Sequence, residues 1–139
     1  MIYLGLDLGS KTLGLSISDR TSTIATSLDV LRYKSEEELF NNLDVVVSKN
    51  NIDAFVLGNP KNLDGSDSVR SNITLEFRDK LINRYNKEVI MQDERLSTVE
   101  AERMLINNNT RRKNRKKVID KIAATIILQT YLDRRKNER

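Results

Sequence analysis

The chain has 139 residues, contains no histidine and no cysteine, and carries a formal net charge of +4. This length suits one domain, residues 1–139, with a hydrophobic core, and is too short for two. The missing residue types exclude disulfides, Cys/His zinc sites, thiol nucleophiles and every mechanism that needs a histidine. Any catalysis must then use carboxylates, Lys, Tyr, Ser/Thr or a metal held by oxygen ligands. Because no stretch is long and apolar enough to span a membrane and no signal-peptide pattern opens the chain, we expect a soluble, cytoplasmic protein.

The positive charge is concentrated near the C-terminal end. Residues 111–139 hold 11 Lys/Arg and 3 Asp/Glu, a net charge of +8, whereas residues 1–110 hold 13 Lys/Arg and 17 Asp/Glu, a net charge of −4. Within Arg111–Lys117 every residue except Asn114 is basic. Such concentrated charge favours a polyanionic partner. A solvated helix end or a basic loop is the alternative interpretation.

The first predicted strand, residues 2–9, carries an acid, Asp7, in its interior. A second predicted strand, residues 13–18, follows at once. Strand residues alternate between the two faces of a sheet, so a hairpin with matched faces would surround Asp7 with small residues. These small residues are Gly5, Gly9, Gly14, Ser16 and Ser18. The arrangement leaves room for a cation or a phosphate beside Asp7, whereas a structural Asp that satisfies a nearby turn is the alternative.

The remaining predicted elements alternate between strands and helices. Strands are predicted at residues 27–31, 54–58 and 89–91, and helices at residues 35–49, 69–85, 97–105 and 119–127. Capping-box patterns, Ser35 with Glu38 and Ser97 with Glu100, mark two of the helix starts. The order β-β-β-α-β-α-β-α-α predicts one α/β domain with a mixed five-stranded sheet and helices on both of its faces.

Two further acids stand out by their position. Glu94 follows a short apolar strand and precedes a helix cap, so we expect it at a carboxyl end of the sheet, where open α/β sheets bind ligands. Asp120 precedes Ala123 and Ala124 in the last helix, and these small residues would let that helix approach the sheet near Asp7. Alternatively, Glu94 pairs with a neighbouring cation and Asp120 stabilises a helix N-terminus.

Five segments of the sequence carry a more specific signal. They are Gly5–Gly9 with Lys11 and Gly14, Ile17–Asp19, Gly58 and Pro60 with Leu63–Ser66, Asp93–Glu102, and Ile119–Ala124. With this combination the chain resembles the bacterial YqgF family of ribonuclease H-like nucleases over nearly its whole length. The Asp93-Glu94-Arg95 segment together with the final Asp-x-x-Ala-Ala, Asp120–Ala124, is the most specific part.

The family is described as nucleases of pre-16S rRNA and as resembling Holliday-junction resolvases. The resemblance implies a ribonuclease H-like fold, 5′-end processing of pre-16S rRNA in ribosome biogenesis, and Asp7, Glu94 and Asp120 as the catalytic, metal-binding acids. The chain departs from the family pattern at Thr12, where a second basic residue is usual, at Ser27, where a proline is common, and at Asn59, where an apolar residue is usual. No departure replaces an acid, although the one at position 12 removes a possible phosphate contact near Asp7.

Three carboxylates can hold one or two Mg²⁺ or Mn²⁺ ions. In a two-metal site one ion activates a water molecule and the other stabilises the leaving oxygen, so no histidine is required. Lys11 and Arg95 are candidates to position the phosphate. The residues predicted to hold the nucleic-acid backbone are Arg111, Arg112, Lys113, Arg115, Lys116 and Lys117.

The nature of the partner follows in part from the aromatic content. The chain has four Tyr and three Phe, none within the basic run, so stacking on unpaired bases should not dominate and a duplex or structured strand is favoured. The resemblance implies a structured RNA, with branched DNA as an alternative. A junction resolvase would work as a symmetric dimer, and both a monomer and a homodimer remain open. Two other classes compete with the nuclease. One is an actin-like ATPase or sugar kinase, which needs two such domains, and the other is a non-catalytic RNA-binding ribosome-assembly factor.

Overall fold

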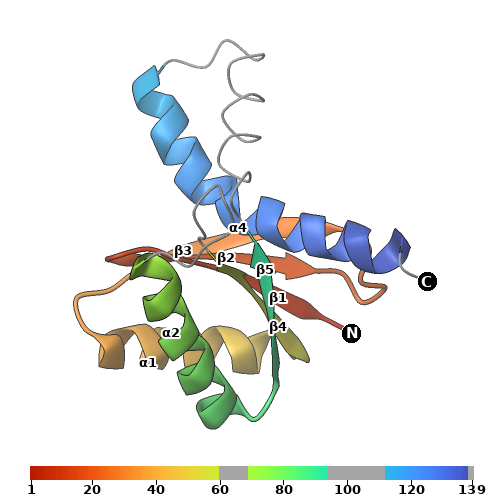
Figure 1. Cartoon of the computed structure of the whole chain (residues 1–139), viewed down its shortest axis with the longest axis horizontal. Helices are drawn as coiled ribbons and strands as arrows, with labels where there is room; N and C mark the ends of the chain where they lie inside the picture. Colours follow the sequence, from red (N-terminus) through yellow and green to blue (C-terminus); the bar gives the residue numbers. More distant parts are fainter. Residues whose placement is uncertain (60–68, 94–111, 138–139) are drawn as a thin grey trace.

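The computed structural model describes residues 1–59, 69–93 and 112–137. A five-stranded sheet forms its centre, with α1 and α2 on one face and α4 on the other (Figure 1). The strands are β1 Tyr3–Leu8, β2 Thr12–Ser18, β3 Ala25–Arg32, β4 Ala54–Asn59 and β5 Glu88–Asp93. The helices are α1 Glu36–Lys49, α2 Val69–Tyr85 and α4 Arg112–Asn137.

The sheet is mixed, as the element order predicts. Its strand order is β3-β2-β1-β4-β5. The β3–β2 and β2–β1 pairs are antiparallel, and the β1–β4 and β4–β5 pairs are parallel. The five predicted strands are confirmed. The first, β1, is one residue shorter at each end than predicted, and the other four extend one or two residues further at one or both ends. The helix predicted at residues 97–105 lies outside the described residues.

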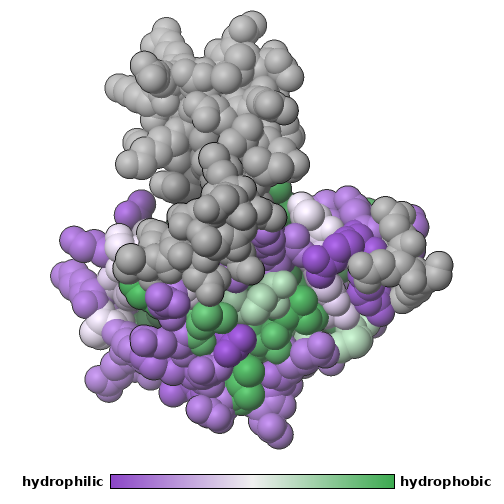
Figure 2. Space-filling view, viewed as in Figure 1, coloured by the Kyte–Doolittle hydropathy of each residue, from purple (hydrophilic) through white to green (hydrophobic). Residues whose placement is uncertain are grey.

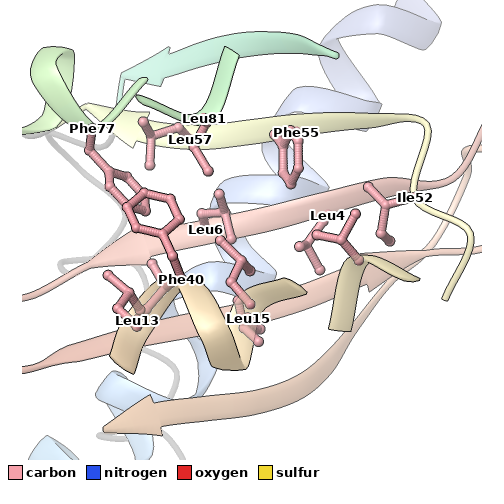
Figure 3. Close-up of a cluster of buried hydrophobic side chains, with 13 residues drawn as sticks. Leu4, Leu6, Leu13, Leu15, Phe40, Ile52, Phe55, Leu57, Phe77 and Leu81 are labelled. Carbon is pink, nitrogen blue, oxygen red and sulfur yellow. The ribbon is translucent and has the colours of Figure 1, made fainter. Parts of the chain in front are cut away.

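The larger core lies between the sheet and α1 and α2 (Figure 3). Leu4, Leu6, Phe55 and Leu57 point from the central strands toward these helices and are fully buried. The predicted cap of α1 is confirmed, because the Ser35 hydroxyl accepts a hydrogen bond from the backbone nitrogen of Glu38 at 3.2 Å.

A second, smaller core lies between the other face of the sheet and α4. It is formed by Tyr3, Ala54 and Val56 of the sheet and by Ile127, Leu128 and Leu132 of α4. The predicted buried stripe of the last helix is confirmed, with Ala124 and Ile127 fully buried. The predicted start of this helix is wrong. The helix begins at Arg112, so part of the basic run forms its first turns.

The surface seen in Figure 2 is mostly hydrophilic. Apolar side chains gather in its middle, where β5 lies in Figure 1. This strand is the edge of the sheet, and Val89, Ile90 and Met91 are only half-buried. Among the described residues, no helix combines the length and the apolar character needed to cross a membrane.

Candidate nuclease active site

Asp7 lies near the carboxyl end of β1, on the face of the sheet that α4 covers. The predicted hairpin is confirmed with its faces matched, because Asp7 pairs with Gly14 and Gly5 pairs with Ser16 across β1 and β2. On the other side of β1, Leu6 pairs with Leu57, so the next residue of β4, Gly58, follows beside Asp7. Asp7 is half-buried and has a glycine on each neighbouring strand. The two neighbouring strands therefore add no side chain directly beside this carboxylate.

The next pair of small residues on this face, Gly5 and Ser16, has a structural role. The Ser16 hydroxyl donates a 2.7 Å hydrogen bond to the carbonyl oxygen of Ala124. A Cβ atom on Gly5 would lie 2.8 Å from Leu128 Cβ and 3.0 Å from the Ala124 carbonyl oxygen. The predicted close approach of the last helix is confirmed. Helix α4 packs directly on the sheet at Gly5 and Ser16. A ligand can therefore approach this face of the sheet only near the carboxyl end of β1, where Asp7 lies.

Helix α4 crosses β1 in the antiparallel direction. Tyr3 packs edge-on against Tyr131, with ring centroids 5.4 Å apart, whereas Gly5 meets Ala124 and Leu128. Contacts therefore move toward the start of α4 as β1 runs toward Asp7. Asp120 is one helical turn before Ala124, and it lies two turns after Arg112, too far from the N-terminus for the helix dipole to explain it. Figure 1 shows the first turns of α4 extending beyond the sheet.

The turn between β1 and β2 is fixed to the sheet by three hydrogen bonds. The Gly9 nitrogen donates to the Thr12 oxygen at 2.7 Å, and Tyr33 donates from its nitrogen to the Lys11 oxygen and from its hydroxyl to the Gly9 oxygen. The Lys11 side chain is exposed on this turn. Its backbone is therefore held in place while its ammonium group remains available to a ligand.

The end of β5 lies two strands away from Asp7. Val89 and Met91 pack against the α1 and α2 side of the sheet and Ile90 against the α4 side, so Gln92 shares the face of Asp7 and Asp93 does not. Gln92 is only 5% exposed, and its Oε1 atom has no hydrogen-bond partner in the described part of the chain. Gln92 is not among the residues predicted from the sequence, although it precedes Glu94 by two residues.

One departure from the family pattern has a structural explanation. Asn59 ends β4 on the α2 side, is 7% exposed, and accepts a 2.8 Å hydrogen bond from the Ser71 hydroxyl. A polar residue is tolerated here because α2 supplies a partner. Asn59 therefore holds the beginning of α2 against the sheet and does not face Asp7.

The other predicted site residues are described in part or not at all. Glu94, Arg95 and Arg111 lie outside the described residues. Only the helical backbone is described for Arg112, Lys113, Arg115, Lys116, Lys117 and Asp120. Within the described residues, no three Asp or Glu side chains lie together as a metal site, so the predicted three-acid site stays a prediction.

Comparison with known proteins identifies the family. The model of the RuvX family, described as Holliday junction resolvase, matches residues 1–134. The chain belongs to the RuvX family. The predicted resemblance is confirmed by relatives named "Putative pre-16S rRNA nuclease". The protein of Caldanaerobacter subterraneus is 46% identical over 138 residues, covering 99% of each chain. The protein of Lactococcus lactis subsp. cremoris is 43% identical over 132 residues, covering 94% of this chain and 92% of the relative.

Two solved structures share the RuvX fold at low sequence identity. The RuvC protein of Thermus thermophilus, in complex with a Holliday junction substrate, has a TM-score of 0.59 and 13% identity, covering 98% of this chain and 96% of RuvC. The fowlpox virus resolvase, in complex with Holliday junction DNA, has a TM-score of 0.56 and 16% identity, covering 96% and 97%. At these identities the likeness concerns the fold, and it confirms the predicted ribonuclease H-like architecture.

Proposed function

We propose that this RuvX-family chain is a divalent-metal-dependent nuclease, carried on a single ribonuclease H-like domain, that hydrolyses phosphodiester bonds during 5′-end processing of pre-16S rRNA. The observation that carries the proposal is the place of Asp7. It is a half-buried carboxylate at the carboxyl end of a central strand, beside Gly14 on the neighbouring strand and on the same sheet face as Gly5, where α4 packs. Open α/β sheets bind ligands at this end. The names of the relatives supply the substrate.

Glu94 is the second acid in the proposal. Gln92 lies on the Asp7 side of the sheet and Asp93 on the other. In the sequence Glu94 is two residues after Gln92, so it has the same parity. This parity favours Glu94 over the adjacent Asp93 as the acid that acts together with Asp7.

Asp120 is the third acid in the proposal. It precedes Ala124 by one turn, on a helix whose contacts with β1 approach Asp7 in that direction. In the proposal Asp120 therefore lies toward the Asp7 end of β1 and not toward Tyr3.

The donor set suits a hard cation. Carboxylate oxygens are the ligands that Mg²⁺ and Mn²⁺ prefer, and the glycine beside Asp7 on β2 leaves room for them. When bound, one or two such ions would supply an activated water and neutralise charge at the scissile phosphate. In the proposal Asp7, Glu94 and Asp120 hold the ions. Lys11, whose side chain is exposed, and Arg95 orient a phosphate.

The basic run is proposed to hold the nucleic-acid backbone. The residues are Arg111, Arg112, Lys113, Arg115, Lys116 and Lys117. Positive charge is unfavourable in the first turn of a helix, and the first turn of α4 contains no acid to compensate for it. A bound phosphate backbone would relieve this repulsion, which favours a polyanion over a purely solvated helix end.

A Holliday junction resolvase is the second candidate function. The family description and the shared fold with two resolvases favour it, and a four-way DNA junction is its substrate. A non-catalytic RNA-binding assembly factor is the third possibility, and it differs from both nucleases because it would bind its target without cutting it.

Cleavage assays with an Asp7→Asn variant test the proposal. The substrates are a structured RNA with the 16S leader and a four-way DNA junction, each with Mg²⁺ or Mn²⁺ and with EDTA. We expect metal-dependent cutting that falls at least about a hundredfold in Asp7→Asn, since loss of residues that only support metal ligands already costs about 10–100-fold. Asp79→Asn is the matched control, because Asp79 is exposed on α2 and pairs with its neighbour Arg78.

The outcomes separate the three functions. Preferred cutting of the RNA supports rRNA processing, and preferred cutting of the junction supports resolution. Near-wild-type activity in Asp7→Asn contradicts the metal-site proposal. Tight RNA binding without any cutting identifies an assembly factor.

A further inference from the structure

Gln92 has an amide oxygen that nothing in the described part of the chain uses. Its Oε1 atom is buried and has no hydrogen-bond donor among the described residues, and the whole residue is 5% exposed. The orientation of the amide is fixed at its other end, since Nε2 donates to the Asp93 carbonyl oxygen at 3.3 Å. A flipped amide would direct two oxygens at each other there. A buried acceptor without a donor is rare in native proteins and calls for a physical explanation.

The position of Gln92 in the sheet relates it to Asp7. Gln92 pairs with Gly58 across β4 and β5, and Gly58 follows the residue of β4 that pairs with Leu6, the neighbour of Asp7. All three residues belong to the α4 face, by the alternation of their strands. Asp7 and Gln92 therefore stand on either side of a residue without a side chain.

The spacing suits a single bound ion or its water shell. Two strand separations of about 4.8 Å place the two Cα atoms about 10 Å apart. An ion coordinated at about 2.1 Å by an oxygen on each side accounts for about 4 Å of that gap. Two side chains that lean over Gly58 can supply the remainder. A bulky side chain at position 58 would prevent this approach.

We propose that the Gln92 amide oxygen is an additional, uncharged ligand in the coordination shell of the divalent cation held by Asp7. This inference rests on the proposed function, because it requires a cation at Asp7. An amide oxygen is a suitable donor for hard cations and adds no charge to a site that already has three proposed carboxylates. The bound cation would satisfy this buried oxygen, which has no hydrogen-bond partner in the described part of the chain.

Two substitutions of Gln92 should change the Tm and the Mn²⁺ affinity in opposite directions. Gln92→Met keeps the volume of the side chain and removes its amide oxygen. We therefore expect a higher Tm for the metal-free protein than for the wild type, and an affinity for Mn²⁺ that is at least about tenfold lower. Gln92→Glu buries a carboxylate, so we expect a lower Tm without metal, a rise in Tm on adding Mn²⁺ that exceeds the wild-type rise, and tighter Mn²⁺ binding. Calorimetric titration with Mn²⁺ and thermal unfolding measure both effects without an activity assay.

Thr125→Val is the matched control. The Thr125 hydroxyl is the other buried side-chain atom without a partner among the described residues. Gln129, one turn later on the same side of α4, donates from Nε2 to the Thr23 oxygen and accepts from the Ala25 nitrogen, so Thr125 faces the β3 edge of the sheet and Gln92 the β5 edge. We expect this variant to raise the Tm and leave the Mn²⁺ affinity unchanged.

The results distinguish this inference from the proposed function. Wild-type Mn²⁺ affinity in Gln92→Met, with binding lost in Asp7→Asn, overturns the role of Gln92 and keeps the site at Asp7. A lower metal-free Tm in Gln92→Met also overturns it, because the side chain would then be structural. No Mn²⁺ binding by the wild type, or equal binding by Asp7→Asn, overturns both.

Discussion

At the scale of single residues, the absence of side chains matters as much as their presence. Gly5 lets α4 approach the sheet, and Gly14 adds no side chain beside Asp7. The two glycines occupy the same face of the β1–β2 hairpin but serve different purposes. Gly5 positions the helix that carries Asp120, whereas Gly14 borders the candidate site. The pair therefore links packing of the smaller core to the geometry of the site.

Substitution of Gly5 by alanine should destabilise the fold. Its Cβ would overlap Ser16 Oγ and would lie 2.8 Å from Leu128 Cβ and 3.0 Å from the Ala124 oxygen, and the last of these is backbone that can yield only if α4 moves. We expect a loss of about 1–3 kcal/mol in the free energy of unfolding, typical of overpacking. Urea unfolding measures it.

The matched control for Gly5→Ala is Gly9→Ala. Its Cβ would meet the Thr12 hydroxyl at 2.8 Å, and that side chain can rotate away. The loss of stability should be clearly smaller. An equal loss of unfolding free energy in the two variants would contradict the view that the close packing of α4 on β1 requires glycine at position 5.

At the scale of elements, ion pairs join α1 to α2 over the larger core. Arg84 of α2 donates two hydrogen bonds to Asp44 of α1, at 2.8 and 2.5 Å, and the Tyr85 hydroxyl donates a third at 2.6 Å. Lys80 and Glu36 form a second pair at 2.8 Å. The Arg84 side chain holds the pKa of the Asp44 carboxyl below its usual value of 3.8. Burial and the same carboxylate raise the pKa of Tyr85, which stays protonated and continues to donate.

Loss of the Asp44 charge should destabilise the protein in a pH-dependent way. The folded-state pKa of Asp44 is lowered, so its contribution is present above the unfolded value near 3.8 and is lost as the pH falls through the folded value. We expect Asp44→Asn to lower the free energy of unfolding by about 1 kcal/mol at pH 7, since the pair is partly exposed and screened by solvent. The difference in unfolding free energy between Asp44→Asn and the wild type should be the same at pH 7 and pH 5 and smaller at pH 3.

Asp79→Asn serves as the control in the same pH series. Asp79 pairs with its neighbour Arg78 within α2 and joins no second element. Its stability should follow the wild type at each pH. A difference between Asp44→Asn and wild type that persists unchanged to the lowest pH would show that the charge of Asp44 is not the cause.

The elements that the sequence predicts correctly are those with a local signal. The cap at Ser35 and the four-residue spacing of Phe77 and Leu81 predict α1 and α2, and alternation in β1 places Asp7 on its correct face. The start of α4 is mispredicted because six consecutive polar residues, five of them basic, show no apolar period, and packing of the later turns extends the helix through them. Gln92 is missed since its importance depends on Gly58, which is distant in sequence.

At the scale of the whole molecule, the acidic and the basic residues belong to different parts of the fold. The sheet with α1 and α2 belongs to the acidic part of the chain, and α4 carries basic residues at both of its ends. Its first turns extend beyond the sheet (Figure 1), and its last turn holds Arg134, Arg135 and Lys136. Arg134 and Arg135 lie over the rings of Tyr131 and Tyr3, with 5.7 and 5.8 Å to the ring centroids. Contacts with aromatic rings already engage these two cations, whereas the start of α4 has no acid in its first turn.

Neutralising the basic run should therefore weaken nucleic-acid binding and its salt dependence. We expect Arg111→Gln, Arg112→Gln and Lys113→Gln together to lower the affinity for structured RNA and to reduce the slope of log affinity against log salt by about 0.7–0.9 for each phosphate that is no longer neutralised. The control of equal charge change is Arg134→Gln, Arg135→Gln and Lys136→Gln, at the opposite end of α4. Binding titrations between about 50 and 200 mM salt, a range over which phosphate contacts dominate the change in affinity, measure both slopes. A smaller slope only in the first variant supports the start of α4 as the backbone contact. An unchanged slope there, or an equal decrease in both variants, would mean that the basic run does not hold the nucleic acid in the way proposed.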